Sequence, residues 1–184
     1  MGKEQVEKRK PNGVLDYISL AVTTCGVGYL PLMPGTFGSM LGAGFYAFLA
    51  FTFRSYRYSS ELAAPEFFVA TIHAVILVSF LLFCLLGIWA AGRSVDLLGN
   101  TDASEAVVDE VIGQLIVFLF IPFTSSWLLI LAGFGLFRLF DIWKPYPIDY
   151  LQTLPGGIGV CADDILAGVY AGVVLTVIYA ATLM

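Results

Sequence analysis

Long apolar runs constrain the fold of this chain more than any other feature of its sequence. Of its 184 residues, 59% are hydrophobic and only 12% are charged, and the mean hydropathy is +0.87. Soluble domains average about 25% charged residues, whereas a run of about 20 apolar residues is long enough to cross a bilayer. We therefore predict an integral membrane protein, with apolar segments suited to spans at 40–53, 67–91, 106–143 and 165–184.

The run at 106–143 is too long for one span, and the segment 122–126, which contains a proline, interrupts it. Split there, each half has about 17 residues, or roughly 26 Å of helix, against a bilayer core of about 30 Å. We predict an all-α, polytopic membrane helical bundle of about five spans, forming one domain at 14–184 after a charged tail at 1–13. Residues 14–30 carry Asp16 within apolar sequence, which favours an N-terminal helix in the membrane interface.

Four carboxylates crowd the start of the 106–143 run and the residues before it: Asp102, Glu105, Asp109 and Glu110. On a helix the first three would share one narrow sector, with Glu110 about 100° from Asp109. Near lipid this crowding is unfavourable unless a cation neutralises it, and Mg²⁺ is the usual hard cation beside phosphates. A solvated acidic loop is the alternative interpretation.

A Pro/Gly-rich segment at 31–39 precedes the first span. Its two prolines argue against regular helix, while Gly35 and Gly38 allow backbone amides to face a ligand. We expect a re-entrant-like loop in which a phosphate binds these amides beside the hydroxyls of Thr36 and Ser39, with Ser39 capping the next helix. An ordinary turn is the alternative.

A second charged cluster ends the 106–143 run. Arg138, Asp141 and Lys144 follow i,i+3 spacing and therefore share one helix face, and Pro145 then ends the helix. An ion-pair cluster at the membrane interface would need no ligand, and it is the alternative to a phosphate-binding role.

A third cluster, Asp163 and Asp164, follows a glycine-rich segment at 155–160, which we expect to be a flexible loop. At the start of the last span such a pair either caps the helix or holds a metal. Because the turn at 122–126 is short, the two spans beside it are antiparallel. The three charged clusters are therefore expected to converge on one membrane face.

Basic residues indicate which face this is. Placing the charged clusters on the cytoplasmic side satisfies the positive-inside rule. Only Arg54 and Arg57 then fall on the opposite side. The cations on the cytoplasmic side are Lys3, Lys8, Arg9, Lys10, Arg93, Arg138 and Lys144.

Several chemistries are disfavoured by what the sequence lacks. The sole histidine, His73, lies in the middle of a predicted span, which argues against a phosphohistidine and favours an interhelical hydrogen bond. The three cysteines (Cys25, Cys84, Cys161) have neither zinc-ligand spacing nor a Cys-x₅-Arg motif. No basic patch on a soluble scaffold indicates nucleic acid as a partner. The favoured chemistry is a metal-activated water attacking phosphorus, with Arg and Lys stabilising the phosphoryl oxygens. A small cation transporter or channel with an acidic interfacial site is the competing class.

Four blocks, taken together, resemble the phosphatidylglycerophosphatase A family: GVGYLPLMPGTFGS (26–39), VVDEVIG (107–113), FRLFDIWKPYP (137–147) and GGIGVCADDILAG (156–168). The resemblance runs from about residue 14 to the C-terminus. It implies a Mg²⁺-dependent enzyme of the bacterial cytoplasmic (inner) membrane. Such an enzyme dephosphorylates the membrane phospholipid phosphatidylglycerophosphate to phosphatidylglycerol, in phospholipid synthesis.

The resemblance also implies site residues. Carboxylates at the matching positions are Asp109, Glu110, Asp141, Asp163 and Asp164, and the cations beside them are Arg138 and Lys144. Our hypothesis assigns the aspartates to one or two Mg²⁺, Glu110 to metal binding or to general-base catalysis, and the two cations to the terminal phosphate. Gly35, Thr36 and Ser39 would also bind the substrate. Relatives often carry a basic residue shortly before the double glycine, and the segment 150–153 has none.

Overall fold

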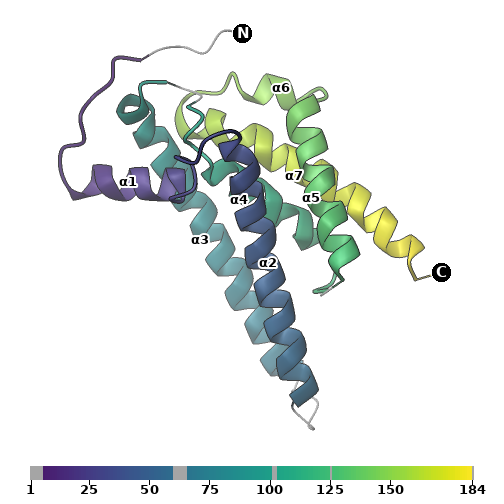
Figure 1. The fold of residues 1–184 in the computed structure, drawn as a ribbon. Helices are drawn as coiled ribbons and strands as arrows, with labels where there is room; N and C mark the ends of the chain where they lie inside the picture. Colours follow the sequence, from purple (N-terminus) through teal and green to yellow (C-terminus); the bar gives the residue numbers. More distant parts are fainter. Residues whose placement is uncertain (1–5, 60–65, 101–102, 125, 184) are drawn as a thin grey trace.

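The computed structural model describes residues 6–59, 66–100, 103–124 and 126–183. The elements, in chain order, are α1 (Val14–Thr24), α2 (Pro34–Ser59), α3 (Glu66–Leu98), α4 (Val108–Val117), the 3₁₀ turn η1 (Phe118–Phe120), α5 (Trp127–Trp143), α6 (Ile148–Leu151) and α7 (Gly156–Ala181). The described residues form helices and no strand, so the all-α prediction is confirmed. In Figure 1 the long α2 and α3 extend downward together, and α1 crosses the upper part of α3.

Within the described residues, three helical segments are long and apolar enough to cross a membrane: Pro34–Arg54, Ala70–Leu98 and Gly156–Ala181. α4 has only 10 residues, or about 15 Å of helix, which is half of a bilayer core. α5 has 17 residues. The prediction of five spans is therefore not confirmed. The predicted interruption is confirmed, because η1 ends at Phe120 and α5 begins at Trp127.

The segment predicted as a re-entrant-like loop is in part the beginning of a helix. α2 begins at Pro34, and a proline in the first turn loses no intrahelical hydrogen bond because its missing N–H would have had no partner there. Ser39 lies in the second turn, where its hydroxyl donates to the Gly35 carbonyl oxygen at 2.9 Å. The expectation that Ser39 caps this helix was therefore wrong.

The glycine-rich segment before the acidic pair is also helical. α7 begins at Gly156, so Asp163 and Asp164 lie about two turns inside the helix and do not cap it. The glycines permit close packing and do not form a flexible loop. A Cβ atom at Gly157 would overlap the Ile88 carbonyl oxygen and lie 2.7 Å from the Gly92 nitrogen. Small residues at these positions let α3 and α7 approach closely.

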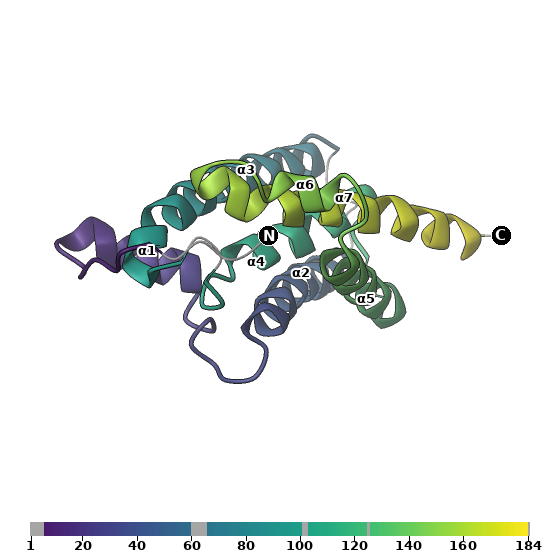
Figure 2. The same ribbon diagram turned by 90° about the horizontal axis from the view of Figure 1, so that it is seen from above.

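The short α4 lies at the centre of the bundle, packed against α2, α3, α5 and α7 (Figure 2). Its backbone approaches that of α7 at two glycines. A Cβ atom at Gly113 would lie 2.5 Å from the Asp164 carbonyl oxygen, and one at Gly168 would overlap the Gly113 carbonyl oxygen. Asp109 and Glu110 precede Gly113 by about one turn, so this close contact sets them beside Asp164.

Candidate active site

Four helices bring the predicted site residues to one end of the bundle, the upper end in Figure 1. α2 supplies Gly35, Thr36 and Ser39; α4 supplies Asp109 and Glu110; α5 supplies Arg138 and Asp141, with Lys144 directly after it; α7 supplies Asp163 and Asp164. The convergence that we predicted from helix topology is present in the structure.

Three carboxylates form the centre of this group. Carboxylate oxygens of Asp109, Glu110 and Asp164 all lie within 4.8 Å of one another. Asp164 is buried, and the other two side chains are half-buried. Two oxygens that bind one Mg²⁺ at about 2.1 Å lie at most about 4.2 Å apart, so small side-chain rotations suffice to surround an ion. Glu110 Oε2 is buried without a hydrogen-bond partner, as is Asp163 Oδ1. This all-oxygen donor set therefore fits a hard divalent cation.

Without a cation these carboxylates oppose one another's ionisation. Burial raises the pKa of Asp109 well above its usual value, and the charges of Glu110 and Asp164 raise it further. Burial also raises the pKa of Glu110, and the Asp141 carboxylate adds to the effect. A bound divalent cation would reverse this preference, because it favours the ionised form of each ligand.

The two cations of the site already have carboxylate partners. Arg138 Nη1 donates to Asp141 Oδ2 at 2.5 Å, and Lys144 Nζ donates to Asp163 Oδ2 at 2.5 Å. Lys144 also lies 4.0 Å from Asp141 Oδ1. Desolvation alone would lower the pKa of Lys144, but the negative charges, led by Asp163, raise it overall. The ion-pair cluster considered from the sequence thus exists, and it borders the three central carboxylates.

The start of α2 forms the wall opposite α4. Because Gly35 has no side chain, Glu110 and Arg138 approach it closely: a Cβ atom there would overlap Glu110 Oε1 and lie 3.5 Å from Arg138 Nη1. Ser39 accepts a hydrogen bond from Arg138 Nη1 at 3.4 Å. The Thr36 hydroxyl is buried without a partner, although the Thr36 amide already donates to the Met33 carbonyl oxygen at 3.0 Å. The unused hydroxyl, and not that amide, is the group left for a ligand.

The predicted helical sector of carboxylates was also wrong, and one residue was overlooked. α4 begins only at Val108, so Glu105 does not share a helical sector with Asp109; it accepts a hydrogen bond from Ser104 at 3.3 Å instead. Asp102 lies outside the described residues. Gln114 was not singled out, yet it is fully buried one turn beyond Glu110 and neither polar atom of its amide has a partner. Its position as a polar residue within an apolar stretch was the available signal.

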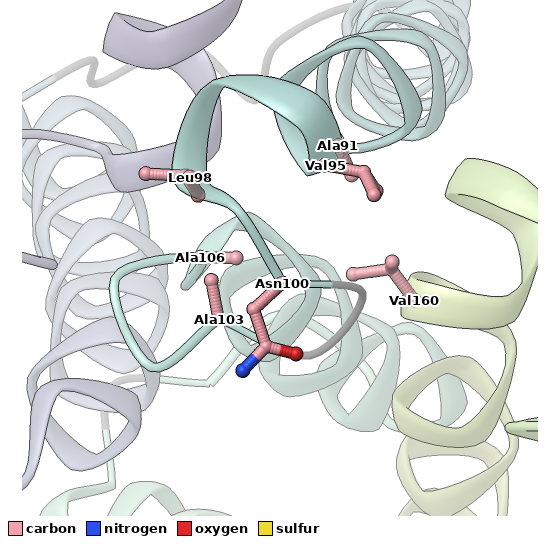
Figure 3. A pocket seen from close by; sticks show the side chains of 7 residues that line it. All are labelled: Ala91, Val95, Leu98, Asn100, Ala103, Ala106 and Val160. Atoms are coloured by element: carbon pink, nitrogen blue, oxygen red, sulfur yellow. The ribbon is translucent and has the colours of Figure 1, made fainter. Parts of the chain in front are cut away.

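A small hollow lies nearby but contains none of the acidic site residues (Figure 3). It is lined by Ala91, Val95 and Leu98 of α3 and by Val160 of α7, and Asn100 supplies its only polar side chain. The three cysteines form no disulfide. Neither feature competes with the carboxylate cluster as the candidate site.

Comparison with known proteins identifies the family of the chain. The phosphatidylglycerophosphatase A family matches residues 20–179. A Haemophilus influenzae phosphatidylglycerophosphatase A is 35% identical over 167 residues, covering 90% of this chain and 91% of the relative. An Escherichia coli phosphatidylglycerophosphatase A is 32% identical over 151 residues, covering 82% and 76%. A Bacteroides thetaiotaomicron protein, whose name proposes a phosphatidylinositol-3-phosphatase, is 35% identical over 156 residues, covering 84% and 89%.

No solved structure matches the chain. The family match at 20–179 contains all four sequence blocks, and it includes every residue of the candidate site. With this extent of similarity and two relatives of that name, the chain belongs to the phosphatidylglycerophosphatase A family.

Proposed function

We propose that the protein is a Mg²⁺-dependent phosphatase of the bacterial cytoplasmic membrane that hydrolyses phosphatidylglycerophosphate to phosphatidylglycerol and inorganic phosphate, a step of phospholipid synthesis. Family membership makes the chain a phosphatase that acts on a phosphate monoester. One observation supports the proposed metal dependence: carboxylate oxygens of Asp109, Glu110 and Asp164 lie close together. None of these three carboxylates has an ion-pair partner among the described residues. The competing cation transporter is not favoured, because the family is one of phosphatases.

The proposed roles follow from the charges and partners of each group. Asp109, Glu110 and Asp164 would hold Mg²⁺, with Asp141 and Asp163 beside them as further ligands. When bound, Mg²⁺ neutralises phosphate charge and lowers the pKa of a water molecule. Glu110 Oε2 is buried without a hydrogen-bond partner, which supports assigning Glu110 to metal binding or to general-base catalysis.

Arg138 and Lys144 would contact the terminal phosphate. Both side chains retain donors beyond those used by Asp141 and Asp163, because a guanidinium has five N–H groups and an ammonium three. Developing negative charge on the phosphoryl oxygens is stabilised by such preorganised donors. The Thr36 hydroxyl and Ser39 would complete this wall from the side of α2.

The proposed orientation places the site on the cytoplasmic side. Lys8, Arg9 and Lys10 precede α1, and Arg9 contacts Asp16 near the C-terminal end of α3, at the same end of the bundle as the site. Arg54 is at the end of the candidate span that begins at Pro34. The excess of cations on the site side supports a cytoplasmic location under the positive-inside rule.

Phosphate release from purified protein in detergent tests the proposal. Phosphatidylglycerophosphate is compared with phosphatidic acid and with phosphatidylinositol 3-phosphate, in EDTA and after Mg²⁺ addition. We expect Mg²⁺-dependent release, fastest from phosphatidylglycerophosphate. If phosphate release is as fast in EDTA as with Mg²⁺, the proposed metal dependence is wrong. If either comparison lipid is hydrolysed faster than phosphatidylglycerophosphate, the proposed substrate is wrong.

A further inference from the structure

The polarity of α1 is inverted relative to that of a surface helix in water. Its fully buried side chains are all polar: Asp16, Ser19, Thr23 and Thr24. Its exposed large side chains are all apolar: Val14 (74% exposed), Leu15 (55%), Tyr17 (63%) and Ile18 (43%). A helix on the surface of a soluble protein has the opposite arrangement.

Bonds within the protein satisfy the buried polar face. The Asp16 carboxylate pairs with Arg9 at 2.6 Å and with Arg93 at 2.7 Å, and it accepts the Asn12 amide at 2.8 Å. The hydroxyls of Thr23 and Ser94 are 3.0 Å apart. Asp16 and Thr23 are about 10 Å apart along α1, yet they contact consecutive residues of α3. α1 therefore crosses α3 at a steep angle, as Figure 1 shows, and cannot turn its polar face outward without breaking these bonds.

The apolar surface continues from α1 to the candidate active site. Tyr29 and Leu30 are exposed, and beyond them Leu32 is 91% exposed and Met33 60%. Leu32 has φ +82°, a backbone conformation that leucine rarely adopts, and its side chain is almost fully exposed. The next residue after Met33 is Pro34, where α2 and a candidate membrane span both begin. The segment 29–33 therefore directly precedes a helix that is long and apolar enough to cross a membrane.

Between α1 and the segment 29–33, the same part of the chain is tied to the start of α4. The Val107 amide donates to the Thr23 carbonyl oxygen at 2.9 Å, which joins the end of α1 to the start of α4 two residues before Asp109. A Cβ atom at Gly28 would overlap the Glu105 carbonyl oxygen, so the following turn packs directly against the chain that leads into α4. A molecule lying along α1 and the segment 29–33 thus has one end next to the site.

We propose that the exposed face of α1 and the segment 29–33 form a docking surface for the acyl chains of the substrate lipid. The inference rests on the function proposed above. Lipid chains are the occupant that matches a wholly apolar face beside a candidate membrane span, because exposing that apolar surface to water is unfavourable. The exposed Lys8 and Lys10 precede α1 and attract an anionic head group. The surface delivers long-chain lipid to the site and takes no part in the chemistry at phosphorus.

Two forms of one substrate separate docking from chemistry: dioleoyl phosphatidylglycerophosphate in mixed micelles, and a water-soluble dibutyryl analogue with the same head group. The test variants are L15Q/I18Q on α1 and L32Q/M33Q in the exposed segment, and the matched control is the apolar L15M/I18M. Both Gln variants should lose about tenfold or more in kcat/KM for the dioleoyl lipid and less than about twofold for the dibutyryl analogue. The Met variant should match the wild type on both substrates.

A loss of the same factor on both substrates, or no loss on either, would overturn the docking surface while leaving the phosphatase activity in place. If the wild type releases phosphate from neither substrate, the proposed function fails and lipid contact is judged separately. Lipid contact is measured by fluorescence quenching: the L15W variant is placed in bilayers with brominated acyl chains, and K10W in the charged tail is the control. Bromine should quench the added fluorescence of L15W more strongly than that of K10W; equal quenching would contradict lipid contact by α1.

Discussion

Substituting Gly35 by alanine directly tests the close contact between the start of α2 and Glu110 of α4. A Cβ atom at this position would overlap Glu110 Oε1 and lie 3.1 Å from Glu110 Cδ. Carbon atoms in contact prefer about 3.5–4.0 Å, so the Glu110 carboxylate must retreat by on the order of 1 Å. The obstructing atom is at the end of a flexible side chain, so the helices themselves need not move.

The expected consequence is a loss of activity with the fold retained. A displacement of about 1 Å in a catalytic group lowers rates by roughly 100-fold, which corresponds to about 2.7 kcal/mol of transition-state stabilisation. The free energy of unfolding should change little, because alanine favours the helix over glycine by about 1 kcal/mol and this gain offsets the cost of displacing the Glu110 carboxylate. The assay is Mg²⁺-dependent phosphate release from phosphatidylglycerophosphate, with thermal unfolding measured in the same detergent.

G44A is the matched control, since Gly44 lies in the same helix and a Cβ atom there meets nothing within 4 Å. G44A should keep wild-type kcat/KM, and its Tm should be unchanged or raised. If G35A also keeps wild-type kcat/KM, the position of Glu110 against α2 does not matter for the reaction, and the assignment of Glu110 to the site is refuted.

Three further substitutions test other groups. D109N should lower phosphate release more than about 100-fold, without lowering the metal-free Tm, because it removes one charge from a crowded carboxylate cluster; near-wild-type turnover would contradict its role. R138A should lower kcat/KM by about 100-fold, whereas unchanged kinetics would leave Arg138 only as the ion-pair partner of Asp141. Hydrogen bonds from Arg9 and the Asn12 amide hold the pKa of Asp16 below its usual 3.8. Its ion pairs therefore stabilise the fold above that pH and are lost as the pH falls. D16N should lower Tm at pH 7 by a margin that shrinks below about pH 4; a constant margin would exclude the ionised form as the cause.

Charge spacing was the most informative signal in the sequence. The i,i+3 spacing of Arg138, Asp141 and Lys144 correctly placed them on one face, and the antiparallel turn brought them to Asp109. These inferences depend on helix geometry and short connections, both of which are local properties of the chain. The break before α5 was predictable for the same reason, since the residue before a proline avoids helical conformation and Ile121 is extended.

Helix beginnings were predicted less well, because proline and glycine have two structural uses. The segments that begin at Pro34 and Gly156 have the composition of loops, yet both are helical. The glycines there are required by contacts with other helices: Gly35 with Glu110, and Gly157 with Ile88. A local composition rule cannot distinguish a glycine that frees the backbone from one that admits a neighbouring helix.

The polar face of α1 was also beyond the sequence patterns. Asp16 alone suggested a helix that avoids the bilayer centre, but its buried state depends on Arg93, which is 77 positions away in the chain. The charged tail had no assigned role, and Arg9 in it supplies the second ion pair. Long-range pairs of this kind decide which side of a helix is buried, and single-sequence periodicity does not contain them.

Binding of Mn²⁺, used as a paramagnetic substitute for Mg²⁺, tests the central claim most directly. The electron paramagnetic resonance signal of free Mn²⁺ falls as the ion binds, so affinity and stoichiometry follow from one titration of the purified protein, with Mg²⁺ as competitor. If Asp109, Glu110 and Asp164 hold the ion together, the wild type binds one or two ions that Mg²⁺ displaces, and D164N binds at least about tenfold more weakly. Equal Mn²⁺ affinity in D164N and the wild type, or no binding to either, would contradict a metal site formed where α4 meets α7.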